Sequence, residues 1–153
     1  MPEGCFICGR IELIKRGENP TVIAELPAGY AVIGDEQFLP GYALLLAKGH
    51  VVELHEMPGA EREQYLRDMV ALGTAVARAT KAAKMNYELL GNAVPHLHCH
   101  VHPRYAWEPE EYRVGPIGAY PRAIRESEAS RFDVAKHGDL FNALRRELAR
   151  LVG

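Results

Sequence analysis

The sequence predicts an α+β fold, in which strands joined in hairpins are separate along the chain from the helices. Short apolar runs bounded by Pro and Gly occupy residues 21–48 and 85–101, as strands in hairpins do. Two longer segments repeat their apolar residues at helical spacing. Helices segregated from an antiparallel sheet are typical of the α+β class. We expect one domain over residues 1–153, with a sheet of about five strands.

Five segments carry the strand signals. "TVIAEL" (residues 21–26) and "YAVIG" (residues 30–34) are separated by "PAG", which predicts two strands joined by a tight turn. "YALLLAK" (residues 42–48) follows a Pro-Gly pair, and its unbroken apolar run indicates burial on both faces. "MNYELLG" (residues 85–91) and "HLHCHV" (residues 96–101) are the predicted fourth and fifth strands.

A long helix is expected from about Ala60 to Lys84. Pro58 and Gly59 precede it as start signals, and Lys81 and Lys84 suit its negative C-terminal end. Its predicted apolar stripe recurs at helical spacing and comprises Leu66, Met69, Val70, Gly73, Val76, Ala77 and Thr80.

The last third of the chain divides into a loop and a helix. Pro and Gly interrupt residues 104–137, so we expect an irregular loop that covers part of the molecule. A C-terminal helix is predicted over residues 138–152, with Asp139 as its N-cap. Its buried stripe would be Leu140, Phe141, Leu144, Leu148 and Leu151.

Composition excludes several classes of protein. A hydrophobic content of 48% suffices for a single core, and a formal net charge of −2 gives no general attraction to nucleic acid. No apolar run approaches the roughly 20 residues that cross a bilayer. The opening "MPEGCFICGR" lacks the features of a secretory signal, so we expect a cytoplasmic protein with neither nucleic-acid nor membrane partners.

Four of the seven histidines, His96, His98, His100 and His102, alternate in "PHLHCHVHPR". In a strand they would share one face, with Cys99 packed on the other. A neutral imidazole is a competent nucleophile toward phosphorus, and a protonated neighbour can hold phosphate oxygens or protonate a leaving group. The row therefore suits phosphoryl or nucleotidyl transfer, although a metal-binding strand or a polar sheet edge would also explain it.

Cys5 and Cys8 form a C-x-x-C, which in a reducing compartment suggests metal or redox chemistry. A structural zinc needs two further ligands. His50 ends the third predicted strand and His96 opens the fifth, so they complete a Cys₂His₂ set if those strands lie close together. His55 is the competing ligand.

The stretch "GNAVPHLHCHVHPR" resembles the signature of the histidine triad (HIT) family, in its bacterial or archaeal form with an N-terminal C-x-x-C. The resemblance covers about residues 5–105. "CFIC", "LPGYALLLAKGHV" and the helix after "ELHEMPGAE" also follow the family's order. It implies a nucleotide-binding HIT-like fold, commonly a homodimer. It also implies a nucleotide hydrolase or nucleotidyl transferase that acts at the α-phosphate through a nucleotidyl-histidine intermediate. The implied substrates are dinucleoside polyphosphates, nucleoside phosphoramidates or related adenylates.

The resemblance also implies residue roles. His98 falls on the family's nucleophile and His100 on the histidine that faces the phosphate or the leaving group, while His96 packs beside them. A structural Zn²⁺ on Cys5, Cys8, His50 and His96 is similar to that of some relatives.

Two departures concern the expected phosphate site. Asn92 and Ala93 stand where the family often has Gln and Ser or Thr, so we expect Asn92 to supply the amide contact. His102 replaces an aliphatic residue and is expected to be peripheral.

Two rival interpretations remain open at this point. One is a zinc-stabilised module that binds purine nucleotides or a partner with little turnover. The other is a zinc hydrolase with its metal on His96, His98 and His100. The residues that line the nucleotide-base cleft also remain undecided, because the candidates suit the core equally well. These candidates are Ile33, Phe38, Leu39 and Leu45.

Overall fold

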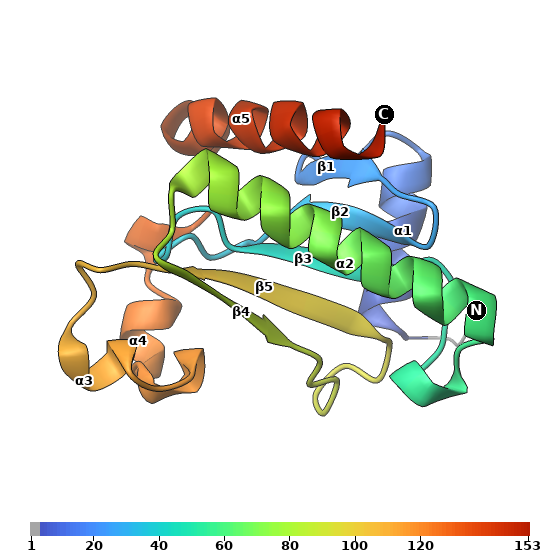
Figure 1. Cartoon of the computed structure of the whole chain (residues 1–153), viewed down its shortest axis with the longest axis horizontal. Coiled ribbons are helices and arrows are strands. Elements are labelled where there is room, and N and C mark those ends of the chain that lie inside the picture. Colours follow the sequence, from blue (N-terminus) through green and yellow to red (C-terminus); the bar gives the residue numbers. More distant parts are fainter. Residues whose placement is uncertain (1–3) are drawn as a thin grey trace.

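The computed structural model describes residues 4–153 and contains one five-stranded antiparallel sheet (Figure 1). The strand order is β1-β2-β3-β5-β4, so the last two strands enter the sheet as a pair beside β3. The expected α+β class and the antiparallel sheet of about five strands are confirmed. The strands are β1 (Val22–Glu25), β2 (Gly29–Ile33), β3 (Ala43–Ala47), β4 (Lys84–Glu88) and β5 (His98–Arg104).

Two long helices cover one face of the sheet. In Figure 1, α2 (Gly59–Thr80) and α5 (Val134–Val152) lie side by side across the strands. The main hydrophobic core fills the space between these helices and the sheet. It contains fully buried residues of both layers, among them Ile33, Leu45, Leu72, Val101 and Leu144.

Helix α2 differs from the sequence prediction in where it ends and in which residues form its buried face. It ends at Thr80, where Lys81 turns into the left-handed conformation (φ 54°) and its N–H donates to the Ala77 carbonyl. Lys84 therefore begins β4 instead of closing the helix. The predicted stripe residues Leu66 and Val70 are exposed, because a neighbouring stripe packs on the sheet. That stripe contains Tyr65, Asp68, Leu72, Ala75 and Val76.

Helix α5 begins earlier than predicted. Asp133, not Asp139, is its N-cap, and the Asp133 side chain accepts the backbone N–H of Lys136 at 3.1 Å. The predicted apolar stripe itself is present, with Phe141, Leu144 and Leu148 buried.

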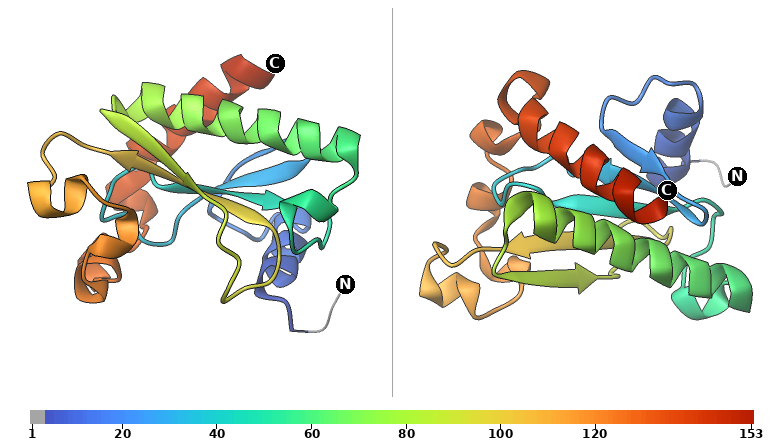
Figure 2. Two further views of the ribbon diagram at one scale, coloured as in Figure 1. Left: turned by 60° about the horizontal axis from the view of Figure 1, so that its bottom comes forward. Right: turned by 45° about the horizontal axis from the view of Figure 1, so that its top comes forward.

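An unpredicted helix, α1 (Phe6–Lys15), covers part of the opposite face of the sheet (Figure 2, left). Its Ile7 and Ile11 join a second hydrophobic cluster with Tyr30, Val32 and Leu46 of the strands. Its N-cap is the Cys5 thiol, which accepts the backbone N–H of Cys8 at 3.4 Å. The C-x-x-C therefore also starts a helix.

The predicted loop at residues 104–137 contains short helical turns. Two of them are α3 (Glu110–Arg113) and α4 (Arg122–Arg125), and the others are η2 (Ile117–Ala119) and η3 (Glu128–Ser130); a further turn, η1 (Leu54–Glu56), precedes α2. The Arg104 guanidinium donates to Glu108, whose carboxylate also accepts the Tyr120 hydroxyl at 2.8 Å. This buried network ties the segment to the end of β5. None of the helices in residues 4–153 is long and apolar enough to span a bilayer.

Candidate functional site

The histidine row lies on the face of the sheet that α1 partly covers. In the register of β3 and β5, His98 pairs with Leu46 and His100 with Leu44. Leu46 belongs to the cluster under α1, whereas Cys99 packs in the core on the other face, as the alternation predicted. His96 precedes β5, which begins at His98.

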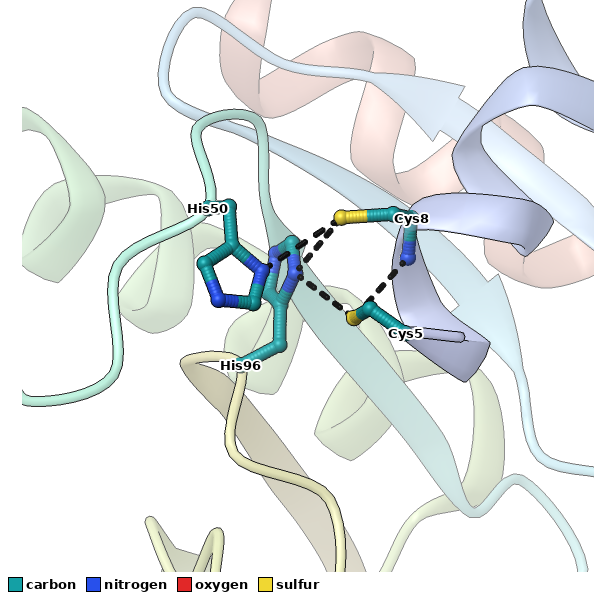
Figure 3. A group of neighbouring side chains, drawn as sticks. All are labelled: Cys5, Cys8, His50 and His96. Carbon is teal, nitrogen blue, oxygen red and sulfur yellow. Dashed lines mark hydrogen bonds between the residues drawn. The ribbon is translucent and has the colours of Figure 1, made fainter. Parts of the chain in front are cut away.

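His96 lies instead in a cluster with Cys5, Cys8 and His50 (Figure 3). The four candidate ligand atoms all lie within 4.8 Å of one another. The Cys8 sulfur is 3.4 Å from Nδ1 of His50 and 3.5 Å from Nδ1 of His96, and the Cys5 sulfur is 3.6 Å from the latter. A tetrahedral zinc with ordinary bond lengths separates sulfur from nitrogen by roughly 3.6 Å. Donor chemistry and spacing therefore both fit zinc.

The surroundings of this cluster also suit a cation. The Ala47 carbonyl accepts from Nε2 of His96 at 2.9 Å, which turns Nδ1 toward the two sulfurs, as a second-shell partner does in metal sites. Burial lowers the pKa of His96, which keeps its imidazole neutral, and burial raises the pKa of the Cys8 thiol. A buried thiolate pair needs a nearby positive charge to form. With both ring nitrogens engaged, His96 has none left for a substrate.

His98 has a defined tautomer. Its Nδ1 lies 2.6 Å from the His96 carbonyl oxygen, and because a carbonyl only accepts, Nδ1 must carry the proton. In the neutral ring, Nε2 then carries the free lone pair. The side chain is buried, and its ring centroid lies 4.9 Å from that of His100.

His100 and His102 are both organised around Tyr42. The Tyr42 hydroxyl lies 2.6 Å from Nδ1 of His100. The Tyr42 ring stacks on the His102 ring, with centroids 4.4 Å apart and planes within 8° of parallel. Burial lowers the pKa of His100 to about 4 and that of His102 to about 3, so both are neutral at pH 7.

The expectation that His102 is peripheral was wrong. Only 5% of the residue is exposed, and its Nδ1 is buried without a hydrogen-bond partner in the part of the chain that the structure describes. Its Nε2 faces the Glu88 carboxylate at 3.6 Å.

Two adjoining cavities meet at His100. One, of about 250 Å³, contains both His98 and His100, with apolar walls from α1 and the strands, including Phe6, Ile7 and Val32. Asp35 lies at this cavity and accepts two hydrogen bonds, of 2.5 and 2.7 Å, from the Arg10 guanidinium.

The second cavity, of about 200 Å³, shares Glu36, Tyr42 and His100 with the first. It adds, among others, Phe38, Glu88, His102 and Arg125. His98 also borders a hollow of about 410 Å³, which does not reach His100.

Several predicted positions fall outside the cavity that His98 and His100 share. Asn92 is exposed on the loop before β5, and its amide donates to the Leu90 carbonyl at 3.4 Å. Ile33 and Leu45 belong to the main core, and Leu39 packs with Ile117 and Tyr120. Phe38 lines the second cavity but not the one that His98 and His100 share. His55 is not in the cysteine-histidine cluster.

Sequence reasoning missed Tyr42, the pair Arg10–Asp35, Glu88 and Arg125. Tyr42 alternates with Leu44 and Leu46 along the chain, so the three side chains point to the same face of the sheet. The pairing of β3 with β5 would therefore have placed Tyr42 beside the histidines. That pairing was not known from the sequence.

Residues 16–107, more than half of the chain, match the family model of the HIT domain. The chain belongs to the HIT domain family. A HIT-like protein of Mycobacterium tuberculosis (strain H37Rv) is 33% identical over an alignment of 109 residues that covers 65% of this chain and 70% of that protein.

Solved HIT structures share the fold. A histidine triad protein of Sinorhizobium meliloti aligns with a TM-score of 0.71 and 20% identity over 89% of this chain and 93% of that chain. A Zn-bound histidine triad family protein of Mycobacterium smegmatis aligns with a TM-score of 0.60 and 24% identity over 97% and 95% of the two chains. In this HIT protein, Cys5, Cys8 and Arg125 lie outside the matched domain, whereas the whole histidine row lies inside it.

Proposed function

We propose that this HIT protein is a nucleotide hydrolase or nucleotidyl transferase that acts at the α-phosphate of its substrate. The candidate substrates are dinucleoside polyphosphates, nucleoside phosphoramidates and related adenylates. One observation carries the proposal: the bond from Nδ1 of His98 to the His96 carbonyl leaves a lone pair on Nε2, in a side chain that lines a cavity with His100. An oriented neutral imidazole of this kind is a competent nucleophile.

The reaction would proceed in two displacements. The Nε2 lone pair of His98 forms a bond to the α-phosphorus, and the bond to the leaving group breaks and takes its electron pair with it. Water or another acceptor then attacks the phosphorus and releases His98. Since the pKa of His100 is lowered to about 4, His100 would act as a neutral hydrogen-bonding group at the phosphoryl oxygens. His100 would therefore not be the protonated neighbour that a histidine row can supply.

The apolar cavity of about 250 Å³ supports a bound nucleoside. Phe6 and Leu44 offer apolar surface on which a purine base can pack, and Asp35 and Arg10 supply polar groups beside it. The base would therefore lie on the face of β3 that carries Leu44 and Leu46, which flank the predicted Leu45.

We further propose that Cys5, Cys8, His50 and His96 hold a structural zinc. The spacing of sulfur and nitrogen atoms and the Zn-bound relative of M. smegmatis support this assignment. Four protein ligands would leave no open position for a substrate, so the ion would stabilise the contact between α1 and the start of β5. His98 and His100 are not part of this cluster, which argues against the zinc-hydrolase alternative.

The function can be tested with a panel of adenosine and guanosine dinucleotides and phosphoramidates. We expect turnover of at least one class, and acid-quenched protein should carry a nucleotidyl group on His98, detected by mass spectrometry of peptides. A module that binds nucleotides without turnover would bind the panel but form neither product nor adduct. Binding alone would therefore contradict the enzyme.

We also propose a homodimer that joins through β4 and the adjacent side of α2. Strand β4 is at the end of the sheet order, and Val70, Tyr87 and Leu90 are exposed. The Tyr87 hydroxyl lies against Gly73, one turn beyond Val70, so α2 and β4 contribute to one surface. Val70→Glu should shift sedimentation from dimer to monomer, whereas Val114→Glu, also exposed but in the 104–137 segment, should not. A wild-type monomer would contradict the proposal.

A further inference from the structure

Tyr42 lies in the middle of the candidate site but belongs neither to the histidine row nor to the cysteine-histidine cluster. Its hydroxyl is 2.6 Å from Nδ1 of His100, and its ring borders both cavities that meet at His100. The contact joins neighbouring strands, because Tyr42 immediately precedes β3 and His100 is in β5. The role of Tyr42 depends on which of the two groups donates this hydrogen bond.

The surroundings favour the phenol as donor. Burial raises the pKa of Tyr42, so its oxygen keeps the proton. In the described part of the chain, the Tyr42 hydroxyl has no second acceptor to which that proton could point. If Nδ1 of His100 donated instead, the phenol proton would lack a protein acceptor, and leaving such a donor unsatisfied in a half-buried side chain costs free energy. The phenol therefore donates, and Nδ1 of His100 accepts.

This direction determines the other side of the His100 ring. A neutral imidazole whose Nδ1 accepts must carry its proton on Nε2. Within residues 4–153, His100 Nε2 makes no hydrogen bond, and the side chain lines both cavities. An N–H at this place would donate to phosphoryl oxygens, whereas a lone pair would repel them.

Two neighbours hold the Tyr42 ring in place. On one side it stacks on His102 at 4.4 Å. Gly34 also lies against the ring, since a Cβ added there would lie 2.2 Å from Cδ1 of the ring. The Tyr42 carbonyl also accepts from the backbone N–H of Gly34 at 2.8 Å and from the Gln37 side chain at 2.9 Å. The ring thus contacts the His102 side chain and a backbone position, Gly34, at which a side chain would clash with it.

We propose that Tyr42 is a positioning residue, which holds His100 in the tautomer with its proton on Nε2 and so makes His100 a hydrogen-bond donor to the substrate's phosphoryl group. This inference rests on the proposed function for the identity of the acceptor, but the tautomer can be measured without a substrate. His102 and Gly34 act through Tyr42 by confining its ring.

The test is Tyr42→Phe, which keeps the ring and its stack on His102 but removes the hydroxyl. Long-range ¹H–¹⁵N spectra of the zinc-loaded protein should show His100 protonated on Nε2 in the wild type and a changed tautomer in the variant. kcat should fall by on the order of tenfold, with KM little changed. Tyr30→Phe is the matched control, since Tyr30 is buried on the same face under α1 and does not contact His100.

Each outcome decides the inference. Support requires both the change of tautomer and the fall in kcat, in Tyr42→Phe and not in Tyr30→Phe. A wild-type His100 protonated on Nδ1 would overturn the inference. A change of tautomer without a fall in kcat, or a fall in kcat without a change of tautomer, would overturn it as well. If the wild type turns over no member of the substrate panel, the proposed function fails, and the tautomers of the wild type and of Tyr42→Phe alone decide the role of Tyr42.

Discussion

The first two histidines of the row use the same side chain in opposite ways. At His96 both ring nitrogens are engaged by the protein, one by the Ala47 carbonyl and the other by cysteine sulfur. At His98 only Nδ1 is engaged, by a backbone carbonyl, and the ring lines a cavity. Two residues of separation therefore divide a position suited to holding a metal from one suited to attacking phosphorus. What an imidazole can do here depends on which of its nitrogens the fold leaves free.

The largest expected effect is the loss of turnover when Nε2 of His98 is removed. His98→Asn removes the proposed nucleophile and keeps a polar side chain, so turnover should fall by on the order of 10⁴-fold or more. Nucleotide binding, measured by calorimetry, should be largely retained. Substantial turnover by this variant would mean that His98 is not the nucleophile.

The next effect concerns the metal. Metal analysis should give about one zinc per chain, as the four-ligand cluster requires. Cys8→Ala should lose the metal and several kcal/mol of stability, because binding energy at a structural site is folding energy. Cys99→Ala is the control, since Cys99 is buried in the core and should affect packing but not zinc content. A metal-free wild type with an unchanged melting temperature would contradict the site.

The third test places the two roles side by side. His96→Ala should lose zinc and thermal stability, and its activity should fall because the start of β5 is displaced. His98→Ala should keep zinc and melt like the wild type. If both variants retained zinc and lost only activity, the metal site would have to lie elsewhere. If both lost zinc, the zinc-hydrolase interpretation would gain support.

Local patterns predicted most of this architecture, and long-range pairing accounts for what they missed. Alternation placed Cys99 opposite the histidines, and the C-x-x-C with two histidines predicted the four residues that the fold brings together. Alternation alone did not indicate which set of strand residues faces the histidine row. The predicted Ile33 and Leu45 therefore proved to be core, whereas Val32 and Leu46 line the cavity. A shift of one residue moves a whole strand to the other face.

Capping errors have a similar cause. Asp133 and Asp139 are equally good N-cap residues by type, and the sequence did not show that the helix already includes His137, which is buried in its first turns. His102 was underestimated because its neighbours include Tyr42, Ile117 and Arg125, none of which is close to it in the sequence.

The smallest expected effect concerns the far end of the row, where His102 is buried and neutral. Its folded pKa is about 3 against an ordinary value of 6.5, so between these values the unfolded chain binds a proton that the folded chain does not. Stability should therefore fall as the pH drops from 6.5 toward 3, with a slope from this residue of about 1.4 kcal/mol per pH unit. His102→Phe keeps an aromatic ring against Tyr42 and removes the titrating group. Chemical denaturation of this variant should show a shallower acid slope by about that amount, whereas His55→Phe, at an exposed position, should leave the slope unchanged. Equal slopes in the wild type and His102→Phe would mean that His102 is protonated in the folded protein, in contact with Glu88.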